Sequence, residues 1–400
     1  MASMSLFLHE FHHNLGARFA EANGGEVVND YGDWPAEHAA LRESAGVLDL
    51  SFRGRICLVG SDRARFLHGQ VTNDVKKLAV GSGCYAALTT AKGKMESDLN
   101  IFCLPYELLL DFEPGLTGKI SQRLEKFIIA DDVQIVDAAP HYGLLSVPGP
   151  KAENVIRAIG LFAEIPAKPF DSVKTSDATL GEIYLANQPR LGVCRSRGDE
   201  TQTGKNSETP RVVSCNFENA GFDLFVPTHS LAAIADKLIA AAKQVGGRAC
   251  GWQAFETARI EAGIPRFGVD MDETNLPLEC GIENRAVSYN KGCYIGQEVI
   301  NRIHSVGRVT KELCGLRLAD DLRTLPQKHD KLFYNGKETG FVTSAVKSPV
   351  LDANIALGYI RREAGQIGTE LTLQTAAGES SAKIVELPFV KWQQRKSERR

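Results

Sequence analysis

The stretch 286–304 holds the residue types best suited to chemistry in this chain, a cysteine that follows a lysine and a glycine. A short strand is expected over 286–289, then a turn over 290–292. An apolar residue then recurs every four positions, at Ile295, Val299 and Ile303, which predicts a helix with one buried face. Cys293 would then lie just before a helix N-terminus, beside the charge of Lys291. Both favour the thiolate, so the pattern predicts a reactive or metal-binding cysteine. The alternative is a cysteine that packs as a small buried hydrophobe.

Three acidic positions are candidates for a binding site. Asp98 follows the turn at Gly93, Glu218 lies between two strand-like runs, and Asp270 follows the segment that contains Arg259. Taken singly, such residues are more often turn residues, helix caps or solvated side chains than ligands.

The overall composition excludes several classes of protein. The 400 residues include 46 basic and 49 acidic side chains, a net charge of −3, so direct nucleic-acid binding is not expected. No apolar run has the length of a membrane span, and the first residues lack the order of a secretory signal, so a cytoplasmic location is expected. Walker and dinucleotide-binding loops are missing from the sequence.

The nine cysteines are odd in number and none are paired as C-x-x-C, which indicates reduced thiols and no dedicated metal cage. A cluster shared between two chains through Cys293 stays open as an alternative.

Periodicity predicts an α+β chain with a separate C-terminal part. Helices are expected over 35–45, 116–129, 229–244 and 251–262, and a hairpin over 84–112. From residue 311 onward short strands and turns, including Asn335-Gly336, predict a small β-barrel. We therefore expect a first region over 1–310, built from two interleaved lobes with a polar loop near 198–210. A barrel domain follows over 311–390, then a basic disordered tail over 391–400.

Several segments together resemble the folate-binding superfamily of the glycine-cleavage T-protein, an aminomethyltransferase. In chain order they are Val47-Leu-Asp-Leu-Ser, Phe66-Leu-His-Gly-Gln-Val-Thr-Asn-Asp, Arg259-Ile-Glu-Ala-Gly-Ile-Pro and Asp270-Met-Asp-Glu-Thr-Asn-Leu-Pro. The stretch Lys291-Gly-Cys-Tyr-Ile-Gly-Gln-Glu, followed by Arg302, resembles the signature of the YgfZ branch of that superfamily.

The resemblance implies a three-lobed fold around a channel that holds tetrahydrofolate, with a C-terminal β-barrel. It implies catalytic roles for Cys293 and Asp98 and cofactor-binding roles for Glu218, Arg259, Lys291 and Gln297. A carboxylate suits the two adjacent N–H donors of a pterin, the role that the resemblance gives Glu218. For Arg259 two roles stay open, a grip on the folate tail or a pairing with a neighbour such as Glu256.

Two departures from the T-protein pattern bear on activity. T-proteins have a second acidic residue beside the position of Asp98, and this chain has Ser97 there. The position four residues before Arg259 is often arginine in T-proteins, and in this chain it is Phe255. Three functions follow as hypotheses. The first is a folate-dependent factor that supports iron–sulfur proteins, and through them tRNA modification, with iron–sulfur clients or assembly proteins as partners. The second is an aminomethyl or one-carbon transferase, and the third a non-catalytic folate-sensing scaffold. The first expects Cys293 to be reachable by solvent and to line the same cavity as Asp98 or Glu218.

Overall fold

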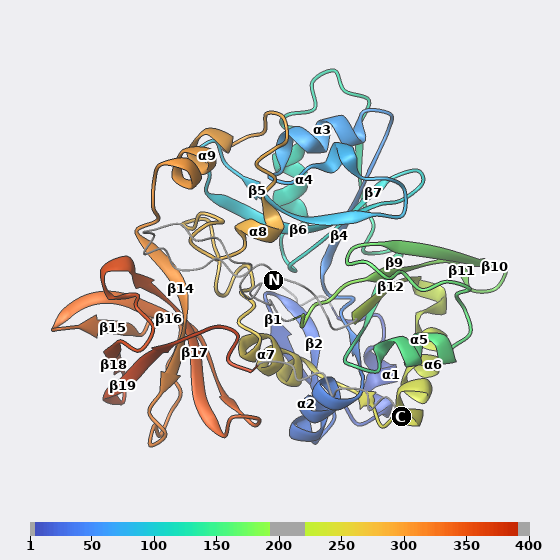
Figure 1. Ribbon diagram of the computed structural model, residues 1–400. Coiled ribbons are helices and arrows are strands. Elements are labelled where there is room, and N and C mark those ends of the chain that lie inside the picture. Colours follow the sequence, from blue (N-terminus) through green and yellow to red (C-terminus); the bar gives the residue numbers. More distant parts are fainter. Residues whose placement is uncertain (1–4, 193–220, 391–400) are drawn as a thin grey trace, which may run out of the picture.

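The computed structural model describes residues 5–192 and 221–390 and arranges them as three lobes around a centre (Figure 1). Helices and strands are mixed throughout, and a closed barrel forms the C-terminal lobe. This is the α+β, three-lobed architecture with a C-terminal barrel that the sequence predicts. Within the described ranges, no helix is long and apolar enough to cross a membrane.

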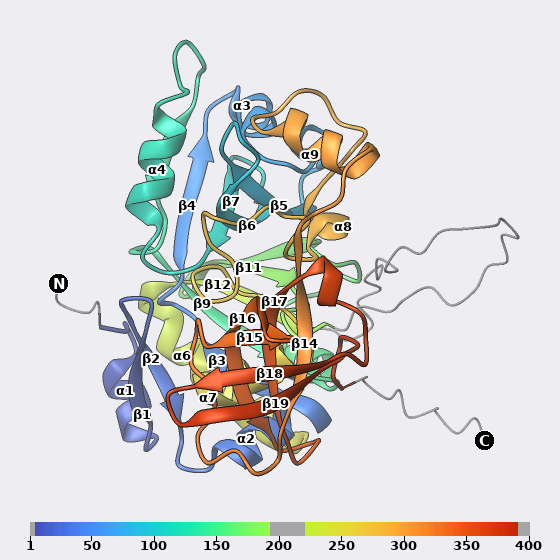
Figure 2. The same ribbon diagram turned by 90° about the vertical axis from the view of Figure 1, so that its left-hand side faces the viewer.

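The first lobe is an antiparallel sheet whose described strands run in the order β5-β6-β7-β4-β8. The strands are β4 (Gly54–Val59), β5 (Gly83–Thr89), β6 (Met95–Cys103), β7 (Leu108–Phe112) and β8 (Gln134–Asp137). Its helices are α3 (Arg63–Gln70), α4 (Thr117–Glu125), α8 (Glu283–Ala286) and α9 (Gln297–Ser305). Figure 2 shows α4 on one side of the sheet and α8 on the other. The sheet is therefore covered on both faces, and its central strands are buried.

The second lobe is a mixed sheet in the order β10-β11-β12-β9-β3-β13. Its strands are β3 (Gly46–Asp49), β9 (Tyr142–Pro148), β10 (Ser172–Asp177), β11 (Gly181–Asn187), β12 (Gly221–Pro227) and β13 (Arg248–Ala249). The helices α5 (Ala152–Ala158) and α6 (Leu231–Gln244) pack on it through an apolar core. Nearby lie α1 (His9–Asn14), the hairpin of β1 (Arg18–Ala22) and β2 (Gly25–Asp30), and α2 (Trp34–Glu43). The N-terminus of α2 is capped by Asp33, whose side chain accepts from the amide of Ala36 at 3.2 Å.

The third lobe is a barrel closed in the order β14-β17-β16-β15-β18-β19. The strands are β14 (Lys311–Leu318), β15 (Lys331–Tyr334), β16 (Lys337–Ser348), β17 (Ala353–Arg361), β18 (Glu370–Thr375) and β19 (Gly378–Val385). Asn335 and Gly336 join β15 to β16 with positive φ values of 50° and 76°, as a tight hairpin turn requires. The helix α7 (Trp252–Glu261) lies against α2, β2 and the barrel strands β16 and β17, so it connects the second lobe to the third.

The expected helices at 35–45, 116–129, 229–244 and 251–262 are present as α2, α4, α6 and α7, with ends that differ by a few residues. The expected polar loop at 198–210 and the basic tail at 391–400 lie outside the described residues.

The prediction for 286–304 is wrong in two respects. Residues 283–286 form the short helix α8, and no strand follows them. The later helix, α9, begins only at Gln297, because Gly296 before it adopts a φ of 92°. A Cβ on Gly296 would lie 2.6 Å from the carbonyl oxygen of Thr90, so the backbone makes a close approach there that suits glycine. The buried residue of α9 is Ile300, whereas the sequence pattern predicts a buried face formed by Ile295, Val299 and Ile303.

Candidate functional site

The hairpin of β5 and β6 places Asp98 at the centre of the molecule. Asp98 pairs with Ala87 across the hairpin. Because side chains alternate along a strand, Asp98 and Asn100 point to one face of the sheet, while Leu99 and Ile101 point to the other. Leu99 and Ile101 belong to the apolar core formed with α3 and α4. Burial of that face thus fixes the direction of the Asp98 carboxyl.

Asp98 lines a cavity of about 100 Å³, which we call the central cavity. Its walls come from the first lobe, from the second lobe, from α7 with the segment after it, and from α8. The lining residues are Arg53, Tyr85, Asp98, Asn100, Glu113, Phe170, Gln188, Pro189, Arg190, Phe255, Arg259, Ile264, Pro265, Arg266 and Arg285. Residues from distant parts of the chain therefore converge on one carboxyl group.

The Asp98 carboxyl makes one hydrogen bond and keeps one free acceptor. The Tyr85 hydroxyl donates to its Oδ2 at 2.8 Å. Its Oδ1 is buried and has no hydrogen-bond partner among the described residues. Burial, and next the negative charge of Glu113, raise the pKa of Asp98 from 3.8 to about 6. This carboxyl can therefore exchange a proton near neutral pH.

The other carboxylates beside the cavity are held by arginines. Arg53 donates to Asp111 at 2.8 Å and also to Glu113. Arg190 donates to the second oxygen of Asp111 at 2.9 Å, and it pairs with Asp223 at 2.6 Å. Although burial opposes ionisation, these two arginines hold the pKa of Asp111 well below its ordinary value. Neighbouring strands thus carry two aspartates whose pKa values move in opposite directions, a separation typical of acid–base sites.

The central cavity presents unpartnered hydrogen-bond acceptors and aromatic rings to a ligand. Asp98 Oδ1 and Gln188 Oε1 are both buried acceptors without a partner in the described part of the chain. Buried polar atoms usually have hydrogen-bond partners, so these two are suited to N–H donors of a ligand. The rings of Tyr85, Phe170 and Phe255 line the same cavity and offer surfaces for stacking.

Arg259 lines the central cavity, but its donors are taken by the protein. The guanidinium donates to both oxygens of Glu256, at 3.2 Å and 3.0 Å, and to the carbonyl of Ile264 at 3.1 Å. It also pairs with Asp270, which accepts from the hydroxyls of Thr343 and Ser344 in the barrel. The pairing with Glu256 is therefore present, and the same cluster ties α7 to the third lobe. A grip on a folate tail stays a prediction.

Glu218 lies outside the described residues. The strand β12 that follows it begins at Gly221, whose carbonyl accepts from the amide of Gln188 at 2.7 Å. Because Gln188 lines the central cavity, Gly221, the first described residue after Glu218, lies next to a residue of that cavity. Ser97, at the position of a second T-protein acid, donates its hydroxyl to the Asp98 carbonyl at 2.9 Å and adds no charge.

Cys293 is exposed, as expected, but it is not among the described residues that line the central cavity, so the expectation that it shares a cavity with Asp98 is wrong. The alternative, a cavity shared with Glu218, falls on residues outside the description. Cys293 also lies four residues before α9, too far to sit at that helix N-terminus. Lys291 does not face the thiol as a free charge. Its Nζ donates to the carbonyls of His68, Val71 and Asn73 at 2.6, 2.6 and 2.7 Å.

Lys291 and Gln297 instead hold the loop that presents Cys293. Burial lowers the pKa of Lys291 to about 8, which leaves the ammonium charged at neutral pH. The Oε1 of Gln297 accepts from the amide of Tyr294 at 3.3 Å. Neither side chain lines the central cavity, so a ligand in that cavity would not contact them as the sequence predicts.

Tyr85, Gln188 and Arg285 are cavity residues that sequence reasoning missed. The strand register offers a signal for one of them, since Tyr85 lies two positions from Ala87, the partner of Asp98 across the hairpin. No local sequence pattern identifies Gln188 or Arg285 as a cavity residue, because their placement depends on packing between lobes.

Comparison with known proteins agrees with this architecture. The model of the GCVT N-terminal domain matches residues 8–187 and 210–291, and that of the glycine cleavage T-protein C-terminal barrel domain matches residues 311–391. An aminomethyltransferase of Symbiobacterium thermophilum is 29% identical over 389 residues, covering 96% of each chain. One of Halalkalibacterium halodurans is also 29% identical, over 93% of this chain and 96% of the relative.

The fold is shared with a solved structure. The crystal structure of the glycine cleavage system aminomethyltransferase T from Bartonella henselae superposes with a TM-score of 0.82 at 22% identity, over 98% of this chain and 99% of that one. With both domain models matched in order along the sequence, the chain belongs to the glycine-cleavage T-protein family.

Proposed function

We propose that this protein binds tetrahydrofolate in the central cavity and transfers a one-carbon unit, of the aminomethyl type, with Asp98 as the group that moves the proton. The observation that carries the proposal is the Asp98 carboxyl, with one unpartnered buried oxygen and a pKa of about 6 beside a cavity. The relatives named aminomethyltransferase support the same reaction class.

Asp98, Tyr85 and Gln188 have separate roles in the proposed reaction. Tetrahydrofolate, when bound, supplies the nitrogen atoms that accept a one-carbon unit. Asp98 is mostly ionised at neutral pH and accepts a proton at Oδ1, the oxygen that lacks a partner among the described residues. Tyr85 donates to Oδ2 and so fixes the orientation of the carboxyl. Gln188 offers its Oε1 to an N–H group of the ligand.

The test uses the purified full chain with tetrahydrofolate and an aminomethylated carrier. We expect release of ammonia and formation of methylene-tetrahydrofolate, with a loss of about a hundredfold or more in Asp98→Asn, the range for removal of a general base. Tyr85→Phe keeps the ring and should lose less. Absence of turnover with folate binding intact would refute the transferase and favour the folate-sensing scaffold.

A second candidate function is support of iron–sulfur proteins, and through them of tRNA modification, as in the YgfZ branch. The observation that favours it is the exposure of Cys293. Among the described cysteines this is the only exposed one, and Lys291 holds the loop that carries it. Cells that carry Cys293→Ala should then lose iron–sulfur enzyme activity while the protein remains folded. Unchanged enzyme activity in those cells would refute this role.

A further inference from the structure

The loop that carries Cys293 lies against the end of α3 and the residues that follow it. The amide of Ile295 donates to the carbonyl of Gly69 at 3.1 Å. From the other side of Cys293, Lys291 donates to three carbonyls of the same segment. The side chains at the end of α3 are therefore neighbours of the loop that presents the thiol.

His68, in the last turn of α3, directs a ring nitrogen at this loop. The residue is only 7% exposed. A Cβ on Gly292, the residue before Cys293, would lie 3.6 Å from the Nε2 of His68. The hydrogen-bond and ion-pair contacts of the ring within the described ranges all involve Nδ1, so Nε2 has no partner there. Because nearly buried polar atoms usually have a partner, Nε2 is suited to accept a proton from a group on the loop.

Asp74 holds the ring of His68 from the opposite side. Its Oδ1 lies 3.3 Å from the Nδ1 of His68, and its Oδ2 lies 3.0 Å from the Nζ of Lys77. Although burial opposes ionisation, the hydrogen bond from Lys77 holds the pKa of Asp74 below its ordinary value. The amide of Lys76 also approaches Nδ1, at 3.4 Å, but a bond to the ionised carboxylate is the stronger of the two. Nδ1 therefore carries the ring proton, and Nε2 is the basic nitrogen.

The charged groups around His68 keep its imidazole neutral. Burial, and next the charge of Lys291, lower the pKa of His68. The charge of Asp74 raises this pKa, and the charges of Lys76 and Lys77 lower it again. The imidazole is therefore uncharged at neutral pH and is able to accept a proton.

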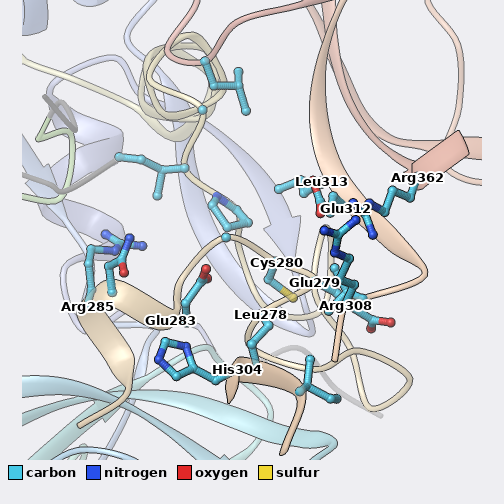
Figure 3. Close-up of a pocket in the computed structure, with 18 of the residues that line it drawn as sticks. Leu278, Glu279, Cys280, Glu283, Arg285, His304, Arg308, Glu312, Leu313 and Arg362 are labelled. Carbon is cyan, nitrogen blue, oxygen red and sulfur yellow. The ribbon is translucent and has the colours of Figure 1, made fainter. Parts of the chain in front are cut away.

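The other histidine near Cys293 in the sequence, His304, faces a different part of the molecule. A second cavity, of about 380 Å³, lies where the segment 278–285, the end of α9 and the first barrel strand meet, and His304 lines it (Figure 3). The ring of His304 stacks on Tyr289, with the ring centroids 3.7 Å apart. Cys293 lines neither this cavity nor the central cavity, so a reaction partner must reach the thiol from the outer surface.

The other described cysteines offer no second exposed thiol for an internal disulfide. All of them are buried or half-buried. The charges of Lys291 and Asp74 act on Cys84, but burial raises the pKa of Cys84 to about 12, so this group stays a thiol. A disulfide formed at Cys293 would therefore join this protein to another molecule.

We propose that His68, oriented by Asp74, accepts the thiol proton of Cys293, so that Cys293 exchanges disulfides with a molecule that approaches the loop. The proton passes from Sγ to Nε2, and Sγ forms a new S–S bond with one sulfur of the incoming disulfide. The old S–S bond breaks, and the departing sulfur leaves as a thiolate that takes the proton from Nε2. One disulfide replaces another, so the step consumes no oxidant or reductant. This inference deepens the second candidate function, because it assigns the reaction partner of Cys293 to the class of disulfides.

Stopped-flow measurement of the full chain with an uncharged dipyridyl disulfide tests the inference. We expect one fast-reacting thiol in the wild type and none in Cys293→Ser. At neutral pH, His68→Gln should lower the rate by about tenfold or more, and Asp74→Asn by about threefold. At about pH 10, where a thiol ionises without a base, both variants should react within about twofold of the wild type. The control His141→Gln replaces an exposed histidine before β9 and should leave the rate unchanged at every pH.

Equal rates for the wild type and His68→Gln at neutral pH would overturn the inference. A loss that persists at about pH 10 would also overturn it, because a displaced loop and not a missing base would then be the cause. If His68→Gln fails to fold, Asp74→Asn decides, and an unchanged rate in that variant refutes the role of the pair. Fast exchange in vitro, with normal iron–sulfur enzyme activity in cells that carry Cys293→Ala, would refute the second candidate function and leave this inference intact. Slow exchange in the wild type, with that activity lost, would do the reverse.

Discussion

Replacement of Asp98 by asparagine should stabilise the protein while it removes activity. The folded chain holds Asp98 with a pKa raised from 3.8 to about 6. Between these values the folded state binds more protons than the unfolded state, so the wild type loses stability as the pH rises through this window. The loss is about 1.6 kcal/mol at pH 5 and about 3 kcal/mol at pH 7.5, and partial exposure of the side chain reduces both values.

The asparagine side chain in this variant carries no such cost, because an amide does not ionise, and its oxygen can still accept from Tyr85. The free energy of unfolding of Asp98→Asn should therefore exceed that of the wild type, and the excess should grow by up to about 1.4 kcal/mol between pH 5 and pH 7.5. Urea titrations followed by circular dichroism at the two pH values measure the difference.

Asp111→Asn is the contrasting control, on the neighbouring strand but with a carboxylate that two arginines hold. Its carboxylate pairs with Arg53 and Arg190, and its lowered pKa means that its ionised form stabilises the folded state at neutral pH. This variant should lose about 3 kcal/mol or more, because two buried arginines lose a partner. Destabilisation by Asp98→Asn, or an effect of that variant that does not change with pH, would refute the reasoning about Asp98.

Three further predictions concern catalysis, the loop and the thiol. One-carbon transfer should fall as the pH drops below about 6, where Asp98 gains a proton, and a pH–rate profile without this inflection would contradict its role as base. Lys291→Met should lower the free energy of unfolding by about 3 kcal/mol, since three carbonyls lose a charged donor, whereas Lys76→Met should change it by less than about 0.5 kcal/mol. In the native chain a thiol reagent should modify Cys293 within minutes and buried Cys250 only on unfolding, as peptide mass mapping would show; equal protection of both would contradict the exposed position of Cys293.

Local patterns predicted the elements whose burial repeats regularly along the chain. The alternation on β5 and β6 and the Asn335-Gly336 turn each identify a strand pair, because side-chain direction and turn conformation are set by adjacent residues. The start of α9 could not be predicted in this way. It depends on the approach of Gly296 to Thr90, which is distant in sequence.

The site was predictable only in part for the same reason. The resemblance to the T-protein singled out Asp98, and the structure places it in the central cavity. Its hydrogen-bond partner Tyr85 comes from another strand, and Gln188 comes from the second lobe. The sequence predicts the thiol of Cys293 in a cavity with Asp98 or Glu218, and the structure places it away from Asp98. A shared sequence motif does not specify which surface a loop faces once Lys291 is bound to three carbonyls of another segment.

The most direct test of folate binding beside Asp98 is the number of protons exchanged when tetrahydrofolate binds. N–H groups of a bound folate that donate to the free Oδ1 favour the ionised carboxylate and lower its pKa, so binding near pH 6 should release a fraction of a proton. Calorimetry in buffers of different ionisation enthalpy measures this number. We predict proton release in the wild type that disappears in Asp98→Asn. Binding with the same proton release in both proteins, proton uptake by the wild type, or no binding to the wild type, would contradict the account.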